Sequence, residues 1–345
     1  MPPNLHIDPE RFRIGVVGGG SWGTTLANLL AEKGLRVDLW VFEAEVAEQI
    51  RTLRENRAFL PGVALAANLN ASTDLAQTAA GKDLVAVVVP SHVMRRTTLA
   101  MAGALGPDTF VISASKGIEN RTHLTMTGVL KQTLGLADDR VGVLSGPSFA
   151  AEVARRMPTT VTVASRNLQL AKLAQSVFAT PFFRVYTHED VVGVELGGSV
   201  KNVIAIAAGI VDGLGFGLNT RAALITRGMT EIRRLGLRLG ANPRTFTGLA
   251  GFGDLILTCT GDLSRNHTLG VKIGQGQRLT EILSRTRSVA EGVHTAESVY
   301  HLSRQLNVEM PISHQTYRIL YEELPPKEAL QQLMTRDLKP ELDDE

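Results

Sequence analysis

The sequence has a single cysteine, Cys259, among its 345 residues. One thiol excludes an intramolecular disulfide framework and is typical of a protein kept in a reducing compartment. We therefore expect Cys259 to be a small, buried apolar side chain. The eight histidines include no pair at the spacing of helical metal ligands, so no metal site is predicted.

An excess of charge is also absent, because 36 Lys and Arg residues are balanced by 34 Asp and Glu residues and leave a net charge of +2. The basic residues are scattered along the chain, which argues against a nucleic-acid partner. The first residues lack the basic start and apolar core of a secretory signal. The longest apolar run, residues 203–211, is about half as long as a membrane span requires. We expect a cytoplasmic protein with no integral membrane segment.

A glycine-rich segment, Gly-Gly-Gly-Ser-Trp-Gly at residues 18–23, lies between an apolar run and a helix-like stretch. In this setting Gly18 allows a tight turn, Gly20 lets the backbone approach a pyrophosphate, and Gly23 lets the helix pack closely on the strand. The N–H groups at the start of the helix would face the anion. A second buried strand is predicted at residues 35–41, and Glu43 follows it where a ribose-binding acid is expected. The pattern predicts a dinucleotide site.

Apolar runs of the β type recur up to about residue 190, at 84–89, 110–113, 141–144, 160–164 and 182–186. Helix-length segments separate several of them, which predicts a mainly parallel sheet in a Rossmann-like domain over residues 1–190. From 191 to 345 the β-type runs stop, and helical spacing dominates at 194–211, 220–239, 271–284 and 295–306. We expect this second domain to be all-helical, with glycine-rich loops at 213–217 and 248–253.

Lys201 is the most informative charged residue of the second domain. It lies in an apolar helix, one turn after Gly197 and Gly198, which leave space for a ligand beside its amine. Burial there would lower the pKa of the lysine towards the range in which it accepts a proton near neutral pH, as alcohol oxidation requires. The alternative is a lysine whose ammonium reaches water from an amphipathic helix.

Other polar residues follow strand-like or glycine-rich segments. Lys116 comes directly after a predicted strand, which favours contact with a ligand in the crevice over loop solvation. Gly146 and Ser148 form a comparable turn, which could hold a polar substrate or be a plain turn. Asp254 either serves the site or caps a helix. The Ser264-Arg265-Asn266 triplet suits a phosphate or carboxylate, although a solvated loop could look the same.

The motifs taken together resemble one family, the bacterial type of NAD(P)-dependent glycerol-3-phosphate dehydrogenase, from Gly18 to about Arg336. They are residues 18–23, Glu55-Asn56 with 59–62, 89–92, Lys116-Gly117, 145–150, 195–202 with 212–217, and 249–258 with Arg265-Asn266. The resemblance implies a Rossmann-like domain followed by an all-helical domain like the C-terminal domain of 6-phosphogluconate dehydrogenase. It also implies reversible hydride transfer between sn-glycerol 3-phosphate and dihydroxyacetone phosphate, which feeds phospholipid synthesis.

The resemblance assigns roles to individual residues. Lys201 is expected to be the catalytic base, with Asn202, Asp254 and Lys116 beside it in the catalytic group. The residues expected to surround the phosphorylated triose are Lys116, Gly146, Ser148, Lys201, Asp254, Thr258, Ser264, Arg265 and Asn266. The residues expected to contact NAD or NADP, besides Gly18, Gly20 and Gly23, are Ser21, Trp22, Phe42, Lys116, Ala150, Arg265, Val289 and Glu291.

The segment after the second strand bears on cofactor preference. Phe42, Glu43 and Glu45 stand where a 2′-phosphate would favour a basic residue, so NAD is expected to fit better than NADP. Arg51 and Arg54 could still reach that phosphate. Two other functions remain open, a reductase of another small acid and a non-catalytic dinucleotide sensor. The apolar helices of the second domain could support a homodimer or form its internal core.

Overall fold

The computed structural model describes residues 7–285 and 290–341, and this part of the chain contains one eight-stranded sheet of order β3-β2-β1-β4-β5-β6-β7-β8. All neighbouring strands are parallel except the antiparallel pair β6 and β7, so the predicted mainly parallel sheet is confirmed. The strands are β1 (Arg13–Val17), β2 (Arg36–Trp40), β3 (Leu69–Ser72), β4 (Leu84–Val87), β5 (Phe110–Ser113), β6 (Val141–Ser145), β7 (Thr159–Ala164) and β8 (Phe183–His188).

Strand β3 was not predicted from the sequence. It has four residues, and only Leu69 and Ala71 are buried apolar side chains. Two apolar positions are too few to show an alternating pattern. Pairing with β2 at the edge of the sheet stabilises the strand conformation, which the local sequence alone does not indicate.

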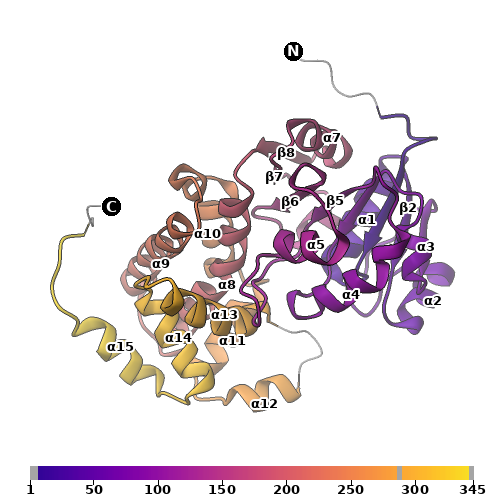
Figure 1. Ribbon diagram of the computed structural model, residues 1–345. Helices are drawn as coiled ribbons and strands as arrows, with labels where there is room; N and C mark the ends of the chain where they lie inside the picture. Colours follow the sequence, from indigo (N-terminus) through magenta and orange to yellow (C-terminus); the bar gives the residue numbers. More distant parts are fainter. Residues whose placement is uncertain (1–6, 286–289, 342–345) are drawn as a thin grey trace.

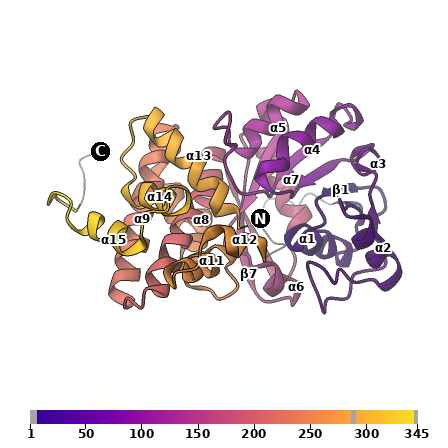
Figure 2. The ribbon, with the colours of Figure 1, turned by 90° about the horizontal axis from the view of Figure 1, so that it is seen from below.

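Seven α-helices belong to the described part of the chain up to β8, and eight follow it. The second group gathers on one side of the molecule, beside the sheet and the helices of the first group (Figures 1 and 2). The first group is α1 (Ser21–Glu32), α2 (Ala44–Leu53), α3 (Leu75–Ala79), α4 (Met94–Met101), α5 (Met126–Leu134), α6 (Ala150–Ala154) and α7 (Leu168–Phe178). The second group is α8 (Val191–Gly213), α9 (Leu218–Arg238), α10 (Asp254–Thr260), α11 (Arg265–Gly274), α12 (Leu279–Ser284), α13 (Glu291–Gln305), α14 (Pro311–Tyr321) and α15 (Pro326–Met334).

Two predictions for the helical part were wrong in detail. The expected helix at 271–284 is divided into α11 and α12, because Gly276 adopts a φ of +92° that ends the helical path. The expected glycine-rich loop at 248–253 instead contains a wide helical turn, η5 (Leu249–Gly253), in which the Gly253 N–H bonds the Gly248 carbonyl. Gly251 packs so closely on the Phe246 backbone that a Cβ would lie 2.3 Å from its oxygen, so the turn needs this glycine.

Helix α8 forms the centre of the helical part. By length and composition it could span a membrane, yet its apolar window is buried on every side by the fold, which identifies it as a core helix. Helix α11 packs directly on its backbone. A Cβ on Gly209 would lie 2.0 Å from the His267 carbonyl oxygen, and one on Gly270 would lie 2.1 Å from that of Ile206.

The connection between sheet and helices is short. β8 ends at His188, and Asp190 caps α8 by accepting the Gly193 N–H at 2.9 Å. The same carboxylate accepts the Thr245 hydroxyl at 2.6 Å, which ties the start of α8 to the segment before η5. We propose Asp190 as the boundary between the two domains, since one apolar core is built wholly from residues before it and a second almost wholly from residues after it.

Candidate active site

The glycine turn between β1 and α1 is shaped by close backbone contacts. Gly18 has a φ of +129°, and a Cβ there would lie 2.6 Å from the Val88 carbonyl oxygen. A Cβ on Gly23 would lie 1.8 Å from the Gly18 oxygen. At Gly20, by contrast, a Cβ would meet no described atom within 4 Å. The turn is thus packed on its inner side and open at the residue where a pyrophosphate would approach.

Helix α1 begins at Ser21 without a side-chain cap, so its first N–H groups are available to an anion. The end of β2 presents Phe42, which is 70% exposed beside Trp40. An exposed aromatic ring next to this turn suits the adenine end of a dinucleotide. Glu43 is exposed at the start of α2. These features fit NAD or NADP across the carboxyl ends of the strands.

Lys201 and Asp254 meet in the buried centre of the site. The Lys201 amine donates to Asp254 Oδ1 and, at 2.7 Å, to the Thr258 hydroxyl. Lys201 and Asp254 are 5% and 1% exposed. Thr258 lies one turn after Asp254 on α10, and its hydroxyl donates to the Asp254 carbonyl at 2.6 Å. Asn202 is the next buried residue of α8. The predicted catalytic side chains Lys201 and Asp254 are therefore brought together by two helices.

Lys116 reaches the same carboxylate from the sheet. Its ammonium donates to Asp254 Oδ2 at 2.6 Å and to the Gly146 carbonyl at 3.4 Å. The Ser148 hydroxyl donates to that carbonyl at 3.1 Å. Because β5 and β6 are parallel neighbours, their carboxyl ends bring Lys116 and Gly146 to one edge of the sheet. The structure thus joins the turns after two strands to the Lys201 centre.

The electrostatics of this centre bring the ionisation of Lys201 close to neutral pH. Burial lowers its pKa from 10.5 to about 7; Asp254 opposes the shift, and the nearby Lys116 ammonium adds to it. One carboxylate lies between two amines, so a neutral Lys201 leaves a balanced Lys116–Asp254 ion pair. A lysine that titrates near neutral pH can both accept and donate a proton.

The start of α11 forms the side of the site where the phosphate is expected. Ser264 is the N-cap, and its hydroxyl accepts the His267 N–H at 3.2 Å. Arg265 is exposed in the first turn, whereas Asn266 is buried and its side-chain oxygen accepts the Gly292 N–H at 2.9 Å. This bond leaves the Asn266 NH2 group as the donor for a ligand.

Trp22 and Ala150, two further predicted cofactor contacts, lie at or beside the start of α1, whereas Val289 is outside the described residues. Trp22 packs its ring on Phe183 at 6.4 Å, so part of it faces the core. The Ala150 carbonyl accepts the Thr25 hydroxyl at 3.3 Å, which places the start of α6 beside α1. Glu291 begins α13, and burial raises its pKa.

Three residues that lie in the motifs, but to which the sequence alone assigned no role of their own, connect the two domains here. The Ser91 hydroxyl donates to Glu291 at 2.8 Å. Buried Glu195 of α8 accepts the N–H and the hydroxyl of Thr127 at the start of α5, and burial raises the pKa of this carboxyl. The Ser199 hydroxyl bonds the Gly117 backbone. Only Glu195, a carboxylate in an apolar helix, carries a sequence signal of a buried polar contact.

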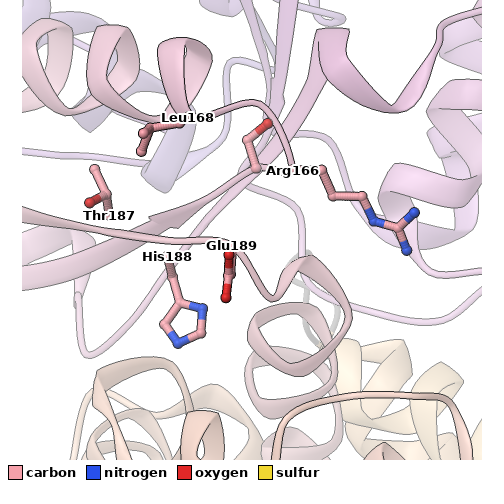
Figure 3. Close-up of a pocket in the computed structure, with 6 residues that line it drawn as sticks. Arg166, Leu168, Thr187, His188 and Glu189 are labelled. Carbon is pink, nitrogen blue, oxygen red and sulfur yellow. The ribbon is translucent and has the colours of Figure 1, made fainter.

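An open hollow of about 370 Å³ lies elsewhere, lined by Ser165, Arg166, Leu168, Thr187, His188 and Glu189 (Figure 3). Since β7 runs antiparallel to β6, the ends of β7 and β8 lie at the sheet edge opposite Lys116. The hollow is therefore separate from the Lys201 centre. Within residues 7–285 and 290–341, no cluster of His, Cys, Asp and Glu could hold a metal ion.

Comparison with known proteins gives a consistent result. The family models for the N-terminus and C-terminus of NAD-dependent glycerol-3-phosphate dehydrogenase match residues 13–171 and 190–331. The glycerol-3-phosphate dehydrogenase (NAD(P)+) of Syntrophobacter fumaroxidans is 56% identical over 332 residues, 96% of this chain and 97% of that protein. The relative of that name from Geobacter sulfurreducens is 57% identical over 330 residues, 95% of this chain and 98% of that protein. The crystal structure of glycerol-3-phosphate dehydrogenase from Coxiella burnetii superposes with a TM-score of 0.91 at 39% identity, covering 95% of this chain and 100% of that one.

Proposed function

Because the chain belongs to the NAD-dependent glycerol-3-phosphate dehydrogenase family, we propose a role for each of its site residues in the family's reaction. The protein interconverts sn-glycerol 3-phosphate and dihydroxyacetone phosphate with NAD or NADP. The observation that carries the proposed roles is the buried Lys201 amine, held between Asp254 and Thr258 with a pKa lowered to about 7.

Lys201 is the acid and base of the reaction. In the oxidation, its neutral amine accepts the proton of the C2 hydroxyl, and in the reduction its ammonium returns that proton to the C2 oxygen. A nicotinamide cofactor held at the glycine turn between β1 and α1 would supply the hydride chemistry at C2. Asp254 stabilises the ammonium that forms, and Thr258 fixes the direction of the amine. Both partners are themselves buried, so the amine keeps one position without reorganising water.

The other polar side chains position the substrate. Arg265 and the Asn266 NH2 group bind the phosphate at the start of α11, where the helix N-terminus also favours an anion. Lys116 extends from the loop after β5 to Gly146 and Asp254, and its ammonium adds a second positive charge to the substrate site. Holding the phosphate fixes the distance from C2 to the Lys201 amine, and such positioning supplies a large part of an enzyme's rate.

Replacement of Lys201 by methionine tests this assignment, because methionine keeps the length of the side chain and removes the proton acceptor. We expect kcat to fall by about 10³-fold or more in both directions, while the affinity for NADH stays within about threefold. The exposed Lys327 of α15 gives the matched control, since Lys327→Met removes a lysine far from the site. Turnover of Lys201→Met within tenfold of the wild type would refute the role.

NAD is the preferred cofactor in this proposal. The Arg51 guanidinium pairs with Glu48, and that of Arg54 bonds the Ala66 carbonyl, so both of the arginines that could meet a 2′-phosphate are already engaged. Glu43 stays exposed after β2 and would bond the ribose hydroxyls. The comparison of kcat/KM with the two cofactors tests the preference, and a higher value with NADP would contradict it.

The product of the reduction is proposed to feed phospholipid synthesis in the cytoplasm. The location is supported by a lone buried cysteine and by the burial of the long apolar helix α8 inside the fold.

A homodimer is proposed from an exposed apolar side chain. Leu218 at the start of α9 is 71% exposed, and a dimer contact would cover it. Sedimentation of the purified protein tests the dimer, and a monomer at all concentrations would refute it.

A further inference from the structure

The loop that carries Lys116 is bound to the catalytic helix through the backbone of the following residue. Gly117 has a φ of +153°, and a Cβ there would lie 2.4 Å from the Ser91 side chain. The position therefore requires glycine, and nothing in its own side chain fixes the peptide. The Ser199 hydroxyl accepts the Gly117 N–H at 2.8 Å and lies 3.2 Å from the Gly117 carbonyl oxygen, to which it donates.

Ser199 lies two residues before Lys201 on α8 and is only 2% exposed. The same helical segment thus places the Lys201 amine on Asp254 Oδ1 and fixes the loop whose Lys116 ammonium bonds Asp254 Oδ2. We propose that Ser199 is a positioning residue, which sets the spacing of the two lysine nitrogens on the Asp254 carboxylate. This inference rests on the proposed role of Lys201 as the acid and base.

The charges around Lys201 show why that spacing matters. Asp254 of α10 and Lys116 of the loop after β5 are the charged groups that act on its amine, and Lys116 helps to lower the pKa. The nearby Cys259 thiol stays neutral, because burial raises its pKa to about 12. Movement of Lys116 away from Asp254 would remove a repulsive charge from Lys201 and shift its ionisation to higher pH.

A second anchor of the same loop supplies a matched control. The Ser298 hydroxyl of α13 bonds the Ile118 carbonyl at 2.9 Å and the Asn120 side chain, and it is as buried as Ser199. Among the described residues, its hydrogen bonds do not include the peptide of Lys116 or Gly117. Loss of either hydroxyl leaves loop groups without their partner and costs stability. Only the loss of Ser199 should change the chemistry.

The experiment measures kcat/KM for glycerol 3-phosphate oxidation against pH, with melting temperature and NADH affinity as checks of folding. For Ser199→Ala we expect the acid limb, the rise of kcat/KM on the acidic side of the profile, to move up by about half to one pH unit. The rate at pH 7 should then fall about two- to fivefold, because a smaller share of the Lys201 amine is neutral. Ser199→Thr keeps the hydroxyl and should restore the wild-type limb, while Ser298→Ala should lower the melting temperature and leave the limb unchanged.

An unchanged limb in Ser199→Ala, or an equal shift in Ser298→Ala, would overturn the inference. If Ser199→Ala does not fold, Ser199→Cys takes its place, because a thiol bonds the peptide weakly and should shift the limb in the same direction. A failure of the proposed function looks different, since the wild-type enzyme itself would then lack an ionisation near pH 7 and Lys201→Met would stay active.

Discussion

Replacement of Asp254 by asparagine removes the one negative charge between Lys116 and Lys201 and keeps the shape of the side chain. An ion pair about 3 Å apart, at an effective dielectric constant of about 20, contributes about 5 kcal/mol. A change of 1.36 kcal/mol corresponds to one pKa unit. In the wild type, burial lowers the pKa of Lys201 to about 7 although Asp254 raises it. Without the Asp254 charge, the pKa of Lys201 should fall further by about two units or more, even after the surrounding groups relax.

The assay is the pH dependence of kcat/KM in both directions, followed by nicotinamide absorbance. In the wild type, oxidation should rise with pH through about 7, because it needs the neutral amine, and reduction should fall through the same pH, because it needs the ammonium. In Asp254→Asn the rise for oxidation should move to about pH 5 or below, and reduction at pH 7 should drop by about 50-fold or more.

Thr258→Val is the control for this experiment, since it removes the other hydrogen-bond partner of Lys201 and keeps the carboxylate. Its acid limb should stay within about one unit of the wild type. The reasoning would be refuted if Asp254→Asn kept an acid limb near pH 7, because the titrating group would then not be the amine that Asp254 contacts.

Two further predictions concern the glycine turn and the stability of the fold. Gly20→Ala should melt like the wild type, since its Cβ enters open space, and it should weaken NADH binding because that space is where the pyrophosphate would approach. Gly23→Ala should lose about 1–3 kcal/mol or more of stability, because its Cβ would meet the Gly18 oxygen at 1.8 Å. Equal melting temperatures of the two variants would contradict this. The lowered pKa of Lys201 means that the unfolded chain binds more protons between pH 7 and 10.5, so the free energy of unfolding gains up to about 5 kcal/mol across this window in the wild type. Urea unfolding at pH 7 and pH 10 measures this difference, and Lys201→Met should lack the gain. An equal change in the free energy of unfolding of both proteins between the two pH values would show that folding does not lower the pKa of Lys201.

The sequence predicted the parts of the fold whose signals are local. The glycine spacing at 18–23 is a local signal, and the structure shows the close approach of Gly23 to Gly18 within the turn. The long apolar runs of β1, β4 and α8 are buried as their composition indicates. Strand β3 was missed because its pairing with β2 decides its conformation.

The candidate site depends more on contacts between distant segments. Lys201 was singled out by its apolar helix, but its ion pair with Asp254 and the approach of Lys116 depend on how α10 and the loop after β5 pack on α8. Ser199 gave no signal, since a serine in a helix is ordinary and its partner, Gly117, is 82 residues away. Tertiary packing, which no local pattern encodes, determines these pairs.

The position of the Lys201 amine in a complex with NAD and dihydroxyacetone phosphate tests the central claim most directly. A crystal structure of that complex should show Lys201 Nζ about 3 Å from the C2 oxygen, with Asp254 still in contact with the amine. An amine that keeps its contacts with Asp254 and Thr258 but lies beyond hydrogen-bond distance of the C2 oxygen would contradict the assignment of Lys201 as the acid and base.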